Sequence, residues 1–198
     1  MKRLIGFGDS LTWGFCNNGL SEHPYSIQLN HLLKSNNLNY VSSNLGFNGE
    51  TTEFLNENFP IIFPEKNINE GDIFLIFGGA NDLASNSSPK QIAQNLNQIS
   101  KHLLKFNNLH FFFTLPGCEC DTLFEGFRKQ REELNKEIRL LSCKEKVLIL
   151  DLDKEIKYHE LSEPERKKYW DDYVHFSAQG YDLMATSIFN NIKNYLMN

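Results

Sequence analysis

The sequence has no apolar run long enough to cross a membrane. It also lacks the apolar core of a secretory signal, because Gly6 and Gly8 interrupt the apolar stretch that follows Met1. From these two absences we expect a cytoplasmic protein with no membrane span.

Lysine and arginine are too few to indicate a nucleic-acid partner. The chain has 20 Lys and Arg against 25 Asp and Glu, which gives a formal net charge of −5. A protein that binds nucleic acid needs clustered cations to displace the counterions of the phosphates, and no such stripe is present. We therefore expect no nucleic-acid partner.

Cysteine is also scarce, with Cys16, Cys118, Cys120 and Cys143 in the whole chain. Zinc sites built from cysteine pairs usually have wider spacing than Cys118 and Cys120, and they need a second pair. The sequence therefore predicts reduced thiols, no metal ion and no cofactor, and it leaves the role of Cys118 and Cys120 open.

The residues that are present predict a globular protein. With 198 residues, of which 40% are hydrophobic, the chain is long enough for one substantial core, so we expect a single domain over residues 1–198. Five short, continuously apolar runs are typical of buried parallel strands. They cover residues 3–7, 38–44, 72–77, 109–115 and 146–152.

Between these runs, apolar residues recur at helical spacing, and the alternation of strands and helices predicts an α/β fold with helices on both faces of a parallel sheet. Ser88 and Gln91 form a capping-box pattern around Pro89. The predicted stripes are Ile27, Leu29, Leu32 and Leu33; Ile92, Leu96, Ile99 and Leu103; Phe127, Arg131, Leu134, Ile138 and Leu141; and Met184, Ile188, Ile192 and Leu196.

Ligands bind at the carboxyl ends of the strands in such sheets, so the loops there are the places to look for chemistry. Taken singly, each has an ordinary structural explanation: Ser10 could cap a helix, Asn81 could be a turn residue, and Asp172 and His175 could be a surface pair.

Taken together, these loops supply the groups that acyl transfer requires. Ser10 is the candidate nucleophile and His175 the candidate base. Asp172 could orient the imidazole if residues 172–175 turn helically, although the adjacent Asp171 is an alternative acid. The backbone N–H groups of Ser10 and Gly49 and the side-chain amide of Asn81 are candidate donors to an oxyanion.

These residues resemble the four sequence blocks of the SGNH hydrolases, also called the GDSL esterase/lipase family. The blocks are Gly8-Asp9-Ser10-Leu11, Asn44-x-Gly46-x-x-Gly49, Gly79-x-Asn81-Asp82 and Asp172-x-x-His175. The resemblance implies a flavodoxin-like three-layer αβα sandwich with a five-stranded parallel sheet. It also implies a Ser-His-Asp mechanism that needs no metal.

For function, the resemblance and the small size of the chain predict a serine esterase for short-chain carboxylic esters, including O-acetyl groups on carbohydrate. A lysophospholipase or acyl-thioesterase of the same family stays open, as does a non-catalytic flavodoxin-like binding module. Asp9 in the first loop, and the lack of a P-loop lysine there, disfavour binding of a nucleotide phosphate. The sequence does not predict the physiological substrate or the oligomeric state.

Overall fold

Five parallel strands form one sheet in the computed structural model, which describes residues 2–142 and 145–197. Cys143 lies outside the described residues. The strand order is β4-β1-β5-β6-β7, and every neighbouring pair is parallel. The strands are β1 (Lys2–Gly8), β4 (Tyr40–Gly46), β5 (Ile73–Phe77), β6 (Leu109–Phe113) and β7 (Val147–Leu150).

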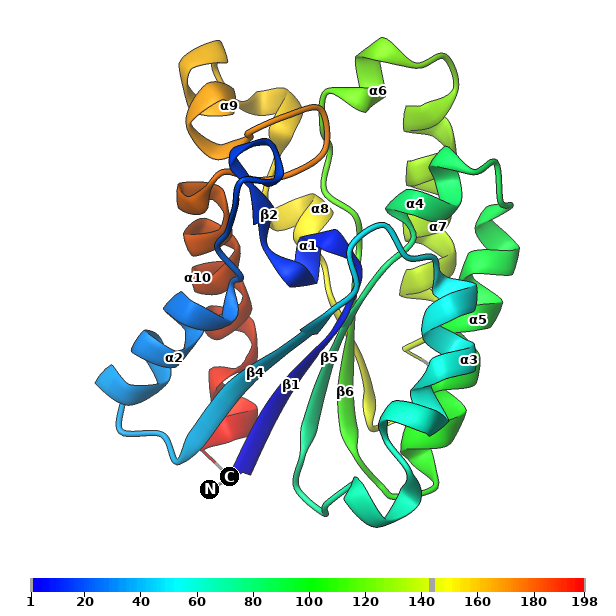
Figure 1. Ribbon diagram of the computed structural model, residues 1–198, viewed down its shortest axis with the longest axis vertical. Helices are drawn as coiled ribbons and strands as arrows, with labels where there is room; N and C mark the ends of the chain where they lie inside the picture. The colour runs from blue at the N-terminus through cyan, green and yellow to red at the C-terminus, as the bar shows by residue number, and fades with distance from the viewer. Residues whose placement is uncertain (1, 143–144, 198) are drawn as a thin grey trace.

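Helices cover both faces of this sheet, so the predicted three-layer α/β fold is confirmed (Figure 1). On one face α2 (Ser26–Ser35) packs against α10 (Ala178–Leu196). On the other face α5 (Pro89–Leu104) lies between α3 (Thr52–Ile62) and α7 (Phe127–Arg139). The chain leaves β1 for β4 on one side and then crosses back to β5, which makes the β1–β5 boundary the switch point where ligands bind in such sheets.

The shorter elements connect the strands and helices. They are α1 (Ser10–Trp13), β2 (Phe15–Cys16), η1 (Asn17–Gly19), β3 (Ser21–Glu22), η2 (Glu65–Asn67), α4 (Ala80–Ala84), α6 (Cys120–Leu123), α8 (Leu152–Glu155), η3 (Tyr158–Glu160) and α9 (Glu163–Tyr169). All of them except η2 follow the carboxyl end of a strand or approach it, so most of the irregular structure gathers at one edge of the sheet (Figure 1).

The strand boundaries differ by at most two residues from those expected. Strand β4 is shifted by two residues at both ends: it begins at Tyr40 and runs to Gly46, whereas residues 38–44 were expected. Gly46 pairs with Gly8 of β1, and a Cβ at this glycine would lie 2.1 Å from the backbone nitrogen of Trp13. A glycine is needed here because the backbone of α1 passes directly against the end of β4.

Three details of the helices differ from the sequence prediction. Ile27 is 41% exposed and not part of the buried stripe of α2, whereas Leu29 and Leu33 are buried. The Ser88 hydroxyl accepts the N–H of Gln91 at the start of α5, but the Gln91 side chain donates to Asn95, so only half of the capping box forms. Helix α3 was not expected at all.

The two ends of the described chain lie close together at the edge of the sheet opposite the short elements (Figure 1). Strand β1 begins there at Lys2, and α10 ends there at Leu196. Within the described ranges, we find no helix that combines the length and the apolar character needed to span a bilayer.

Candidate active site

Ser10 lies at the first position of α1, directly after β1. Asp9 is the N-cap: its Oδ1 accepts the N–H of Leu11 at 2.9 Å, and Gly14 ends the helix with φ of 86°. The Asp9 carboxyl is fully buried, and its burial raises its pKa to about 7. Asp9 therefore braces the loop that presents Ser10.

The structure brings His175 and Asp172 to Ser10 from the far end of the chain. His175 Nε2 lies 2.8 Å from Ser10 Oγ, and His175 Nδ1 lies 2.8 Å from Asp172 Oδ2. Both distances are those of hydrogen bonds, so one continuous line of contacts joins a hydroxyl, an imidazole and a carboxylate.

The loop from Asp172 to His175 is not the helical turn that we expected. Asp172 Oδ1 accepts the backbone N–H groups of both Val174 and His175, at 2.9 and 2.7 Å, and so holds the loop in a bend. Burial raises the pKa of the Asp172 carboxyl, but the hydrogen bonds from His175 and from the two N–H groups outweigh that effect. The net result is a pKa below the ordinary value, so Asp172 is held ionised beside the imidazole.

Asp171, the alternative acid, faces a different partner. Its Oδ2 accepts the backbone N–H of Asn18 at 2.9 Å and thereby ties η1 to the loop before His175. Asp172 and not Asp171 contacts the imidazole.

Phe15 is a site residue that sequence reasoning did not place. Its ring centroid lies 4.3 Å from that of His175, with 36° between the ring planes. The backbone oxygen of Phe15 accepts the hydroxyl of Tyr181 at 3.0 Å. The short strand β2 therefore places an aromatic ring in contact with the imidazole of His175.

The expected oxyanion donors lie on loops that leave the sheet side by side. Gly8 of β1 pairs with Gly46 of β4 and with Phe77 of β5, so the chain leaves these three strands at one level. Gly49 has φ of 81°, and a Cβ there would meet no atom within 4 Å. Asn81 Nδ2 donates to the backbone oxygen of Glu50 at 2.8 Å, which leaves its second amide hydrogen for another acceptor.

Asp82 fixes these two loops to each other. Its buried carboxylate accepts the backbone N–H of Thr52 at 2.9 Å and the Thr52 hydroxyl at 2.6 Å. These bonds join the start of α3 to α4, the helix that carries Asn81. The sequence block contained Asp82, but nothing in it indicated this role.

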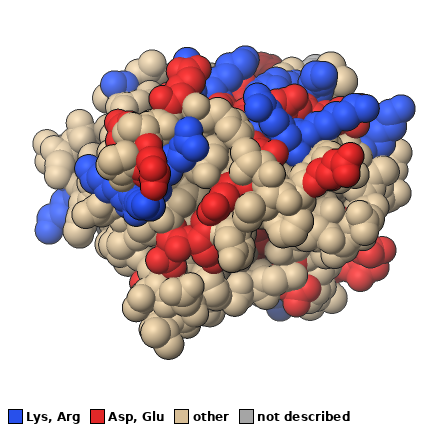
Figure 2. Space-filling model, turned by 90° about the horizontal axis from the view of Figure 1, so that it is seen from above, with Lys and Arg blue, Asp and Glu red and all other residues tan. Residues whose placement is uncertain are grey.

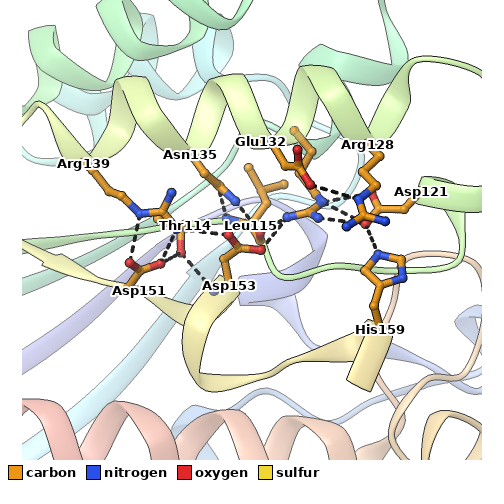
Figure 3. A network of polar contacts seen from close by, with 11 residues as sticks. Thr114, Leu115, Asp121, Arg128, Glu132, Asn135, Arg139, Asp151, Asp153 and His159 are labelled. Carbon is orange, nitrogen blue, oxygen red and sulfur yellow. Dashed lines mark hydrogen bonds and ion pairs between the residues drawn. The ribbon is translucent and has the colours of Figure 1, made fainter. Parts of the chain in front are cut away.

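On the other side of the site, a buried polar network connects α6, α7 and α8 (Figure 3). Arg131, which is 3% exposed, binds Asp121 at 2.8 Å and Asp153 at 2.6 Å, and it also donates to the backbone oxygen of Leu115. His159 Nε2 lies 2.7 Å from Asp121.

This network fixes the position of α6 and, through it, the bend of Asp172 and His175. Asp121 lies in α6, and the backbone N–H of the neighbouring Cys120 donates to the oxygen of Tyr173 at 3.3 Å. Tyr173 lies within the bend, so α6 is attached to the loop that carries the imidazole.

An apolar cavity of about 310 Å³ lies between α4, α6 and α7. Leu83, Cys120, Phe124 and Phe127 contribute to its walls. Leu83 belongs to the same short helix as Asn81, and Cys120 contacts the loop before His175, so the cavity borders the candidate site.

Cys118 is buried and Cys120 half-buried, and both are free thiols, as is Cys16. A hydrogen bond between the thiols of Cys118 and Cys120 raises the pKa of Cys118 and lowers that of Cys120. Across residues 2–142 and 145–197, no group of three or more His, Cys, Asp or Glu side chains is arranged to hold a metal ion.

The strand order β4-β1-β5-β6-β7, with helices on both faces, defines a three-layer α/β protein of the flavodoxin-like topology. The model of the GDSL-like Lipase/Acylhydrolase family matches residues 7–183, and the chain belongs to this family. The protein is therefore an SGNH-type hydrolase that acts on ester bonds, as the sequence blocks predicted.

Solved structures with the same fold include one lipase/acylhydrolase and two esterases. The lipase/acylhydrolase from Enterococcus faecalis has a TM-score of 0.80 at 24% identity, covering 99% of this chain and 97% of the other. The family 3 carbohydrate esterase of Clostridium thermocellum has a TM-score of 0.76 at 19% identity, covering 99% of this chain and 97% of the other. The acetyl xylan esterase AlAXEase has a TM-score of 0.76 at 21% identity, covering 96% of this chain and 99% of the other. A search of curated protein sequences gives no significant match.

Proposed function

We propose that the chain acts as a single-domain serine esterase that hydrolyses short-chain carboxylic esters, with Ser10 as nucleophile, His175 as base and Asp172 as the orienting acid. The observation that carries the proposal is the line of two 2.8 Å contacts from Ser10 Oγ through the imidazole to Asp172 Oδ2.

In the proposed reaction, His175 Nε2 takes the hydroxyl proton while Ser10 Oγ bonds to the ester carbonyl carbon. The C–O bond to the alcohol then breaks, and the alcohol leaves with the proton from Nε2, which gives an acyl-enzyme. Water repeats the sequence: it loses a proton to His175, attacks the acyl carbon and releases the carboxylic acid and Ser10. Asp172 stabilises the imidazolium in each half.

The negative oxygen formed in both halves needs hydrogen-bond donors. We assign this role to the backbone N–H groups of Ser10 and Gly49 and to Asn81 Nδ2. In support, Asn81 is held by the oxygen of Glu50, next to Gly49, so both donors belong to one hydrogen-bonded unit.

For the substrate we propose short acyl esters, including O-acetyl groups on carbohydrate. The carbohydrate esterase and acetyl xylan esterase among the structural neighbours support this choice. A lysophospholipase or acyl-thioesterase is the second candidate, and the apolar cavity between α4, α6 and α7 favours it because its walls suit a longer acyl chain.

Two variants and a series of substrates test the proposal. Ser10→Ala should lower kcat on a small chromogenic ester by about 10³ or more. It should also abolish labelling by a fluorophosphonate probe. Asn81→Ala should lower kcat by about 10²–10³. If Ser10→Ala keeps its turnover, the mechanism is wrong, and if wild type shows neither turnover nor labelling, the protein is a non-catalytic binding module.

The same assay over acyl lengths separates the two substrate classes. Loss of turnover beyond about four carbons supports short acyl esters. A rate that rises towards eight or more carbons, and falls when Phe124 is replaced by a polar residue, supports the second candidate.

A further inference from the structure

Five of the segments around the proposed site contain no Lys or Arg. These segments are residues 9–25, 44–54, 78–88, 114–126 and 171–177, so all 20 Lys and Arg lie elsewhere in the chain. Each of these five segments contains at least one Asp or Glu. Seen from the carboxyl ends of the strands, acidic side chains cross the middle of the face, and Lys and Arg gather at the upper right and at the left (Figure 2).

Glu50, Glu119 and Glu125 are three of the carboxylates in these segments that have no cationic partner among the described residues. Glu119 and Glu125 are exposed and Glu50 is half-buried. By contrast, the nearby acids Asp82 and Asp121 are buried and bonded to Thr52 and Arg131.

The three carboxylates border the site from different sides. Glu50 follows Gly49, and its backbone oxygen accepts Asn81 Nδ2. Glu119 shares the wall of a second cavity, of about 380 Å³, with Asp172 and with Arg166 and Lys167 of α9. Glu125 lies at the apolar cavity between α4, α6 and α7.

Cations from the segment after β7 offset this charge only in part. Lys154 is 3.0 Å from Asp151, and Lys157 is 3.0 Å from Glu160. On α9, Lys167 is paired with Glu163, and Arg166 lies over the ring of Tyr158 at the cavity that Glu119 lines.

From this arrangement we propose that the acidic loops set the substrate class of the active site: it takes esters whose alcohol portion is neutral or cationic and disfavours esters that carry a phosphate, sulfonate or carboxylate. This inference rests on the proposed function, because it concerns the selectivity of the Ser10 site and not a separate binding site. Charges of one sign around a cleft repel a like-charged substrate and raise the local concentration of an oppositely charged one.

The inference also distinguishes among the substrate classes considered above. An acyl-thioester of coenzyme A and a lysophospholipid with an anionic headgroup both bring phosphates to the rim of the site. A neutral acetylated sugar does not.

The test uses three phenyl acetates that differ only in a para substituent: trimethylammoniomethyl, hydroxymethyl or sulfonatomethyl. Each kcat/KM is divided by the rate of hydroxide hydrolysis of the same ester, which removes differences in leaving-group reactivity. We expect kcat/KM for the cation to exceed that for the anion by about tenfold or more at low salt. The ratio should fall towards one at about 1 M salt, where the Debye length is about 3 Å.

A charge-neutralised variant and a matched control assign the effect to the loops. Glu50→Gln/Glu119→Gln/Glu125→Gln should reduce the cation-to-anion ratio at low salt by severalfold. Glu65→Gln/Glu70→Gln removes exposed charge before β5, at the opposite edge of the sheet, and should leave the ratio unchanged.

The outcomes separate this inference from the proposed function. If Ser10→Ala hydrolyses all three esters as fast as wild type, the proposed function fails. If Ser10→Ala is inactive but wild type hydrolyses the anionic ester as well as the cationic one, or the ratio does not change with salt or in the triple variant, only the charge selectivity is wrong.

Discussion

The ring of Phe15 lies against the imidazole of His175, with 4.3 Å between the ring centroids. The other side of Phe15 is covered by η1, where a Cβ at Gly19 would come within 2.9 Å of the ring. The aromatic ring is thus fixed on two sides, and it limits how far the imidazole can turn from Ser10.

Replacing Phe15 should therefore lower kcat more than it raises KM. Phe15→Ala leaves one face of the imidazole without packing, and small displacements of a catalytic group cost large factors in rate, so we expect kcat to fall by about tenfold or more. Phe15→Leu keeps an apolar side chain and should lose less. Steady-state kinetics of both variants, with melting temperatures as a control for folding, check this; a change confined to KM would contradict a positioning role.

Asp9 should make the folded protein less stable as the pH rises through neutrality. Its pKa is raised to about 7 in the folded state, while an unfolded aspartate titrates near 3.9. Between these values the folded protein binds more protons than the unfolded chain, so the free energy of unfolding falls with rising pH, by about 1.4 kcal/mol per unit of pKa difference at most.

Asp9→Asn tests this because the amide can still accept the N–H of Leu11 but does not titrate. Near pH 4 the variant and wild type should unfold at similar urea concentrations, and at pH 8 the variant should be the more stable of the two. The lowered pKa of Asp172 acts in a different window, because its stabilisation is lost only as the pH falls through its depressed pKa. Parallel stability curves from pH 4 to 8 would contradict the prediction.

Removal of Arg131 should destabilise the protein strongly. Arg131→Met leaves the Asp121 carboxylate buried without its main partner, and breaking a buried ion pair in this way costs about 3–5 kcal/mol. The matched control is Arg128→Gln on the same helix, which removes an exposed pair with Glu132 and should cost at most about 0.5 kcal/mol. Urea denaturation of both variants measures the difference, and equal losses would show that the network in Figure 3 contributes little to stability.

The central strands β5 and β6 could be predicted closely because they are buried on both faces and are therefore apolar along nearly their whole length. The edge strand β4 contains Ser42, Ser43 and Asn44 and is partly exposed, and its bounds were predicted less closely. The contact between Ser10 and His175 could be expected because parallel strands bring their following loops to one edge, although 165 positions separate the two residues. Asp172 could be preferred to Asp171 from spacing, although its contact with the imidazole arises from a bend and not from a helical turn.

What could not be predicted depends on contacts between distant segments. Helix α3 begins at Thr52, three residues after Gly49 of the second sequence block. Only Leu55 and Phe59 among its apolar residues are fully buried, and the polar residues between them obscure the helical spacing in the sequence. Arg131 falls at an apolar position of α7, and only the acids that reach it from α6 and α8 explain its burial. The contact between Phe15 and His175 has no local signal, because β2 is two residues long.

The start of β1 at Lys2 and the end of α10 at Leu196 both lie at the edge of the sheet away from Ser10 (Figure 1). A tether joined at either position would leave the carboxyl edge of the sheet, and the candidate site with it, facing outward.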